Sequence, residues 1–143
     1  MAQTFSNEMS GVSSTPVIKP QATAGYGARE RVFRATVTLA SQASGDTIVI
    51  CDLPAGYLFA GAQITTSVTL GTATLSMGDA TSATAFMAAT TFTTANVPVP
   101  VGSAAALAAA ALAATDRIFL TVGAAALPAS GTLVVQVFAT LPN

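Results

Sequence analysis

The sequence predicts an all-β protein, a single β-sandwich or jelly-roll-like domain that follows an extended N-terminal arm. The first observation is that six or seven short segments have strand character, most of them alternating apolar and polar side chains, with turns rich in Gly, Pro and Asp between them. The second is that Thr accounts for 21 of the 143 residues and lies mostly on the polar faces of these segments. Short strands punctuated in this way are typical of sandwiches.

The first strand is expected from residue 32. From Phe33 to Leu39, apolar side chains occupy the odd positions and polar ones the even positions, as in a strand with one buried face. Residues 44–46 (Ser-Gly-Asp) indicate a turn, and Thr47–Cys51 is a second, β-branched strand. We interpret the two segments as a hairpin.

A long strand is expected over residues 57–70, with the even-numbered side chains on one face and the odd-numbered ones on the other. Gly61 inside it indicates a bulge or a bend. Residues 72–77 alternate again, and we interpret them as the hairpin partner of the long strand. The remaining strands are expected at residues 85–92, 116–122 and 132–140.

Residues 95–115 leave two alternatives open. Pro98 and Pro100 exclude a central strand, because proline lacks the N–H that the ladder needs. Ser103 is a suitable N-cap for the Ala-rich run that follows it, which favours a short helix. An irregular or β connection is equally compatible, since a short helix with few apolar side chains to bury is marginal.

Composition argues against most enzyme classes. The chain has no His, one Cys and 11 charged residues, 8% of the total, and it contains no glycine-rich phosphate loop. Its four Asp residues stand at turns or strand ends, where an Asp side chain accepts hydrogen bonds from nearby backbone N–H groups. We therefore expect these residues to stabilise turns, and not to bind a metal or to form the active site of a hydrolase. We predict no catalytic residues, cofactor or metal.

Cys51 is expected to be a small buried apolar residue rather than a reactive thiol. No basic residue adjoins it, and the following Asp52 disfavours the thiolate. The chain begins without a basic stretch followed by an apolar run, and its longest apolar run, residues 104–114, is shorter than the roughly 20 residues of a spanning helix. We therefore expect neither a leader nor a membrane span, and a net charge of −1 gives no basis for nucleic-acid binding.

Charge divides the chain into an arm, residues 1–31, and a domain, residues 32–143. Residues 1–34 carry four basic and two acidic side chains, a net of +2, while the rest carries −3. The arm has few apolar anchors and no strand or helix period, and we expect its arginines to pair with carboxylates of a neighbouring subunit. The expected contact residues are Phe5, Val17, Ile18, Tyr26, Arg29, Arg31 and Arg34.

The stretch TIVICDLPAGYLFAGAQI, residues 47–64, is followed by ATLSMGD at residues 73–79. Together with DRIFLTVGAAALPASGTLVVQVF at residues 116–138, it resembles small β-sandwich capsid decoration (cement) proteins of tailed bacteriophages. The resemblance covers residues 32–140. The Ala-rich run, residues 104–114, departs from the expected pattern.

This resemblance implies a virion protein that is assembled in the host cytoplasm and binds the major capsid protein on the outer capsid surface. It also implies a homo-oligomer, with a trimer favoured, whose arm lies in a groove or adds an edge strand to a neighbour. A tail or head-fibre base component is an alternative with the same composition. A carbohydrate-binding β-sandwich module is a further alternative. It is less favoured because such sites typically use aromatic platforms, and the chain has no Trp and only two Tyr.

Overall fold

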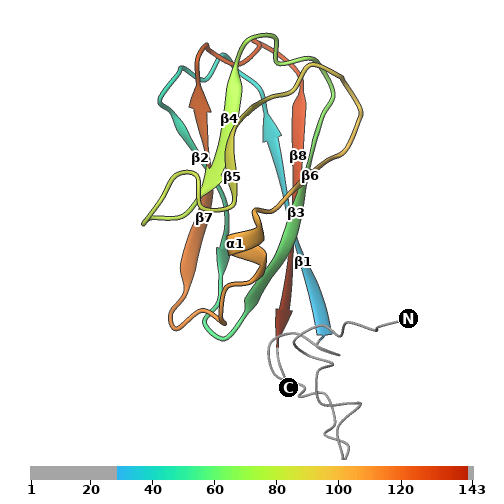
Figure 1. Ribbon diagram of the computed structural model, residues 1–143. Coiled ribbons are helices and arrows are strands. Elements are labelled where there is room, and N and C mark those ends of the chain that lie inside the picture. The colour runs from blue at the N-terminus through green and yellow to red at the C-terminus, as the bar shows by residue number, and fades with distance from the viewer. Residues whose placement is uncertain (1–28, 142–143) are drawn as a thin grey trace, which may run out of the picture.

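The structure, a computed structural model, describes residues 29–141. Two four-stranded antiparallel sheets pack face to face, which confirms the predicted all-β sandwich (Figure 1). Sheet A has the strand order β1-β8-β3-β6, and sheet B the order β2-β7-β4-β5. The elements are β1 (Arg29–Thr38), β2 (Thr47–Leu53), β3 (Leu58–Thr66), β4 (Thr74–Gly78), β5 (Met87–Thr91), β6 (Val99–Val101), α1 (Ala104–Leu107), β7 (Asp116–Gly123) and β8 (Thr132–Leu141).

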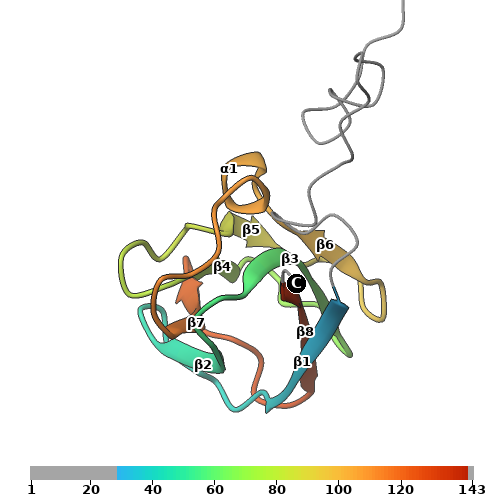
Figure 2. The ribbon, with the colours of Figure 1, turned by 90° about the horizontal axis from the view of Figure 1, so that it is seen from below.

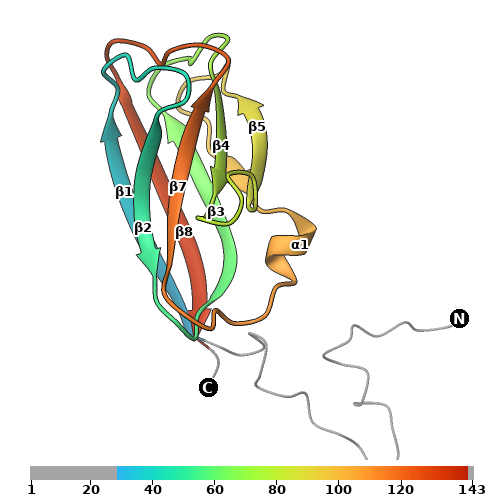
Figure 3. The same cartoon turned by 90° about the vertical axis from the view of Figure 1, so that its left-hand side faces the viewer.

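Strand β8 is the centre of sheet A. It pairs with β1 from Arg29 opposite Leu141 to Thr38 opposite Thr132, and on its other side with β3. Its inner side chains are fully shielded from solvent, as the alternation predicted. Because β1 begins where β8 ends, both limits of the described chain lie at one end of the sandwich (Figure 3).

The first strand starts earlier than the sequence indicated. Arg29 and Arg31, expected in the arm, are paired with β8 inside sheet A. Alternation fails to mark this start because the first four residues of β1 are exposed on both faces.

Both predicted hairpins are wrong. Strand β1 pairs with β8 and not with β2, and β4 pairs with β5 and β7 and not with β3. Each of these two connections crosses from one sheet to the other. Alternation shows which side of a strand is apolar, but it carries no information on the strand across the ladder.

The bulge expected at Gly61 is confirmed by a register shift between Phe59 and Gly61. It also exchanges the two faces of β3. Phe59 is buried and Ala60 is exposed, whereas after the bulge Ala62 and the following even-numbered positions face the core. The predicted assignment of even positions to one continuous face is therefore wrong before Gly61.

The segment left open by the sequence combines both alternatives. Val99–Val101 forms a three-residue edge strand, β6, on the outside of β3. Ser103 caps α1 as predicted, with its hydroxyl accepting from the Ala106 N–H at 3.1 Å. The helix ends at Leu107, and the rest of the Ala-rich run is irregular, since it has little apolar surface to bury.

The core lies between the two sheets, with α1 at the side near β5 and β6 (Figure 2). Phe59 of β3 packs against Phe86, just before β5, with ring centroids 4.4 Å apart. The connection after α1 runs across the end of the sandwich where β2 ends and β3 begins. There the Gly56 N–H donates to the Leu112 carbonyl at 2.8 Å, and the Leu112 N–H donates to the Tyr57 carbonyl at 2.9 Å. These two hydrogen bonds join the connection after α1 to the turn between β2 and β3.

Candidate interaction surfaces

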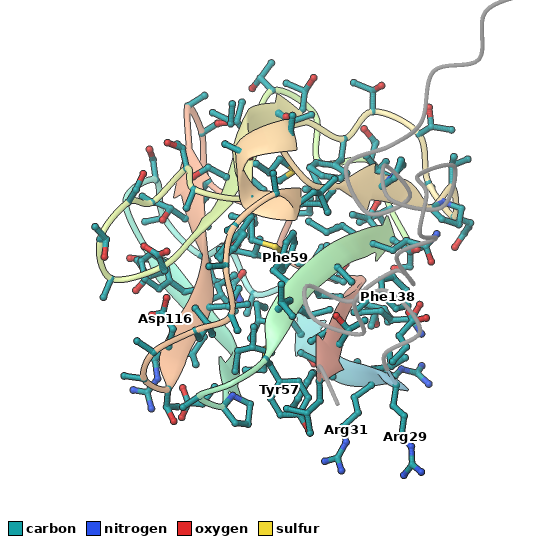
Figure 4. All side chains as sticks on the ribbon, turned by 60° about the horizontal axis from the view of Figure 1, so that its bottom comes forward. Arg29, Arg31, Tyr57, Phe59, Asp116 and Phe138 are labelled. Carbon is teal, nitrogen blue, oxygen red and sulfur yellow. The ribbon has the colours of Figure 1, made fainter. Side chains whose placement is uncertain are left out.

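Charged side chains gather at the end of the sandwich where β1 and β7 begin and β2 ends (Figure 4). Nine charged residues lie within residues 29–141, and six of them are at this charged end. Most of the outer surface of both sheets carries Thr, Ala, Val and Gln instead. The charged end comprises Arg29, Glu30, Arg31, Asp52, Asp116 and Arg117.

Arg31 is positioned by an aromatic stack. Its guanidinium carbon lies 5.7 Å from the ring centroid of Tyr57, a cation–π contact. Tyr57 in turn meets Phe33 edge to face, with centroids 6.1 Å apart and planes at 81°. Arg29, two residues earlier on β1, projects from the same end (Figure 4). Sequence reasoning missed Tyr57 here, because nothing local links it to a strand 26 residues away.

Within residues 29–141 the one ion pair joins Arg117 to Asp52 across β7 and β2. Arg117 donates Nε to Oδ1 at 2.6 Å and Nη2 to Oδ2 at 2.9 Å, a bidentate contact. This hydrogen bonding lowers the pKa of Asp52. Arg29 and Arg31 have no carboxylate partner in the described part of the chain, so their donors are available to another chain.

Arg34 lies apart from these two arginines. The alternation of β1 places it on the outer face of sheet A, opposite Gln136 of β8. The three arginines therefore do not form one cluster, which corrects the sequence-based grouping. The other four predicted contact residues, Phe5, Val17, Ile18 and Tyr26, lie outside the described residues.

Two of the four Asp residues, Asp46 and Asp79, accept turn N–H bonds as predicted, whereas Asp52 lies within β2 and Asp116 begins β7. The Ala43 N–H donates to Oδ2 of Asp46 at 2.8 Å, and the N–H groups of Thr81 and Ser82 donate to Oδ1 of Asp79, both at 2.8 Å. Residues 29–141 hold no group of three or more metal-ligating side chains. Burial, with Asp79 nearby, raises the pKa of Asp116.

Cys51 is half-buried on β2. Burial, with a smaller effect from the neighbouring Asp52, raises the pKa of its thiol to about 11. The thiol is therefore protonated at neutral pH, as expected of an unreactive residue, but Cys51 is half-buried and not buried as predicted. No helix among the described residues is long and apolar enough to cross a membrane.

Aromatic side chains offer no open platform in residues 29–141. Tyr57, Phe59, Phe86 and Phe92 are buried, and the other phenylalanines are half-buried. Carbohydrate modules typically stack sugars on exposed rings, so this part of the chain lacks their main feature.

A shallow groove of about 360 Å³ lies on the outside of sheet A, where β3 and β6 meet α1. Phe138 of β8 and Leu107 of α1 form its walls, with Gly61 and Gly102 between them. None of the residues that line it is charged.

No known protein-family model and no curated protein sequence matches this chain. Solved structures share its fold. A chain of the cyanophage Pam1 capsid asymmetric unit is 24% identical, with a TM-score of 0.67 over 82% of this chain and 89% of that one. A chain of the Ralstonia phage GP4 capsid is 21% identical, with a TM-score of 0.67 over 80% and 86%. A chain of the Helicobacter pylori bacteriophage KHP30 capsid is 12% identical, with a TM-score of 0.52 over 80% and 89%.

Proposed function

We propose that this chain is a structural protein of a phage virion that decorates and stabilises the outer capsid surface by binding the major capsid protein. The observation that carries the proposal is the fold similarity to chains of phage capsid structures, which extends over most of both chains. The resemblance of residues 32–140 to decoration proteins points in the same direction.

The distribution of charge supports a subunit. A soluble monomer usually keeps mixed charges over its whole surface. Here the sheet faces are nearly uncharged and the charges gather at one end, as suits a protein that buries its faces in an assembly. The partners of the proposal are the major capsid protein and further copies of this chain, most simply in a trimer that follows capsid symmetry.

The charged end supplies the specific contact. Arg29 and Arg31 would form bidentate bonds with carboxylates of a capsid subunit, and the stack of Tyr57 on Phe33 reduces the side-chain entropy that Arg31 loses on binding. The arm adds apolar area, which offsets the cost of ordering it. Many weak contacts around a closed shell then act together through avidity.

The first test measures binding of the purified protein to capsids that lack it. We expect saturation at a fixed number of copies per capsid and an increase in the temperature at which the shell releases its DNA. Absence of binding would contradict the decoration role. A tail or head-fibre base protein is the alternative, and a few copies per particle in place of hundreds would favour it.

The second test separates the two groups of arginines. The double variant Arg29→Glu, Arg31→Glu should lose most capsid binding, because reversed charges repel the acidic partner. Arg34→Glu is the matched control, with the same change on the same strand but on the outer face of sheet A. Equal binding by the double variant and the control would rule out the charged end as the contact.

The arm is tested by deleting residues 1–28, which leaves β1 complete. We expect weaker binding to capsids at unchanged stoichiometry. A truncated protein that binds with the original affinity would show that the arm is not an anchor.

A further inference from the structure

The groove beside α1 exists because small residues stand where side chains would otherwise fill it. Gly61 sits in the β3 bulge with φ +131°, and Gly102 follows β6 with φ +156°. A Cβ at Gly102 would lie 3.2 Å from the side chain of Leu107, so the glycine leaves room for that wall. Ala60, exposed at the rim, adds little bulk.

An apolar strip continues from the groove to the edge of sheet A. Phe138 stands opposite Gly61 on one side and Val32 of β1 on the other. Val32 is 52% exposed and Leu107 is 48% exposed, so large apolar side chains at both ends of the strip face solvent. Within residues 29–141 nothing covers them, and covering such surface is favourable by about 25 cal/mol per Å².

We propose that the segment Pro16–Pro20 of the same chain docks in this groove. The described chain starts at Arg29, three residues before Val32 and on the same sheet as the groove. Eight residues, 21–28, separate Pro20 from Arg29, where β1 begins, and a flexible linker of about eight residues spans roughly 16 Å. Three strand spacings, from β1 to β6, amount to about 14 Å.

The tether favours the chain's own segment over any other occupant. A short flexible linker gives an effective concentration in the millimolar range, far above the protein concentration of a dilute sample. A second copy, whose segment is identical, would therefore fill the groove only at protein concentrations in the same millimolar range. This docking concerns the free subunit and does not rest on the proposed role in a virion; a capsid contact of the arm would require the segment to leave the groove.

The composition of the segment matches the groove. Val17 and Ile18 supply apolar side chains, and the flanking prolines favour an extended backbone. Pro100 of β6 removes one ladder donor at that edge, so the segment would form part of a ladder together with its side-chain contacts.

Disulfide trapping tests the docking in the full-length chain. In a Cys51→Ser background, Val17→Cys combined with Leu107→Cys should form an intramolecular disulfide with oxidised glutathione. The matched control combines Val17→Cys with Val49→Cys, which is 56% exposed on the outer face of sheet B. We expect the first pair to close about tenfold faster than the control. Equal rates would overturn the proposal, and so would disulfide-linked dimers, which would identify a second copy as the occupant.

A second experiment examines the groove without new cysteines. Ala60→Glu places a charge at its rim, while Ala89→Glu makes the same change at an exposed position of β5. Ala60→Glu should accelerate amide hydrogen exchange in residues 17–19 several-fold, and Ala89→Glu should leave it unchanged. If exchange in residues 17–19 is equally fast in the original protein and both variants, the segment does not dock.

Discussion

At the scale of single residues, Gly78 shows how closely a loop packs on a strand. It ends β4, and a Cβ there would overlap the carbonyl oxygen of Ser82 and the backbone of Ala83. The loop between β4 and β5 therefore passes directly against the end of β4, where the Asp79 N–H donates to the Ser82 carbonyl at 3.0 Å. The glycine is required for space and not for a left-handed backbone, since its φ is not positive.

Gly78→Ala should therefore destabilise the protein by about 1–3 kcal/mol, because backbone must move to admit the methyl group. Urea unfolding measures the loss. Gly123→Ala is the control, since a Cβ there meets chiefly the side-chain hydroxyl of Thr74, which can rotate away. A cost for Gly78→Ala no larger than that of the control would contradict the close packing.

Cys51 gives a prediction on pH. Its thiol has a pKa of about 11 in the folded protein and an ordinary value of 9.0. Between these values the folded state binds more protons than the unfolded state, so the free energy of unfolding falls as pH rises from 9 to 11. Unfolding of the original protein and of Cys51→Ser across this range measures the difference in slope. Parallel pH profiles would show that the thiol is not shielded.

At the scale of elements, β8 separates an inner face from an outer one. Val135 is fully shielded between the sheets, whereas Val134, its neighbour, is half-buried on the outer face. Val135→Ala should cost about 2 kcal/mol through lost burial and the cavity left behind. Val134→Ala, the same change one residue away, should cost clearly less in the same denaturation experiment. Equal losses would place both side chains in equivalent surroundings.

The N-cap residue of α1, Ser103, joins the helix to the segment just before β5. The Ser103 hydroxyl accepts from Ala106 and donates to the Ala85 carbonyl at 3.1 Å. Ser103→Ala should cost about 1 kcal/mol, measured by thermal unfolding. Ser130→Ala, at an exposed loop position, should leave the melting temperature unchanged. An unchanged melt for Ser103→Ala would mean that α1 is not coupled to the sandwich.

Most strands were predictable from alternation, because each has one face against the core. Residues 116–122 and 132–140 were identified almost to their ends. Pairing was not predictable: β1 and β2 are separated by one turn signal, yet they belong to different sheets. The choice between a hairpin and a crossing depends on contacts with strands distant in sequence, which local composition does not record.

At the scale of the whole molecule, the described chain closes on itself. Its first strand pairs with its last, and β8 also holds β3. Removing residues 132–143 should therefore unfold both sheets together, since sheet A loses its centre and the core loses one wall. Loss of the β-sheet circular dichroism signal and of a cooperative melt is the expected result. Removing only residues 142–143 is the control, and a folded protein without β8 would contradict this account.

The candidate interface was only partly predictable. Arg29 and Arg31 were identified from the charge pattern, and the structure places them together at one end of the sandwich. Arg34 was grouped with them because it is close in sequence, but strand geometry turns it to another face. Tyr57 and the groove at Gly61 and Gly102 depend on segments brought together by folding.

The sequence by itself determined the class of the fold, the scarcity of charge and the absence of His. These properties are local or compositional, so they can be counted along the chain. The tertiary structure decided which strands pair, how the β3 bulge exchanges two faces, and which surfaces carry the arginines and the groove. Such properties arise from packing between distant segments, and that packing is selected by the free energy of the whole molecule rather than by any one stretch.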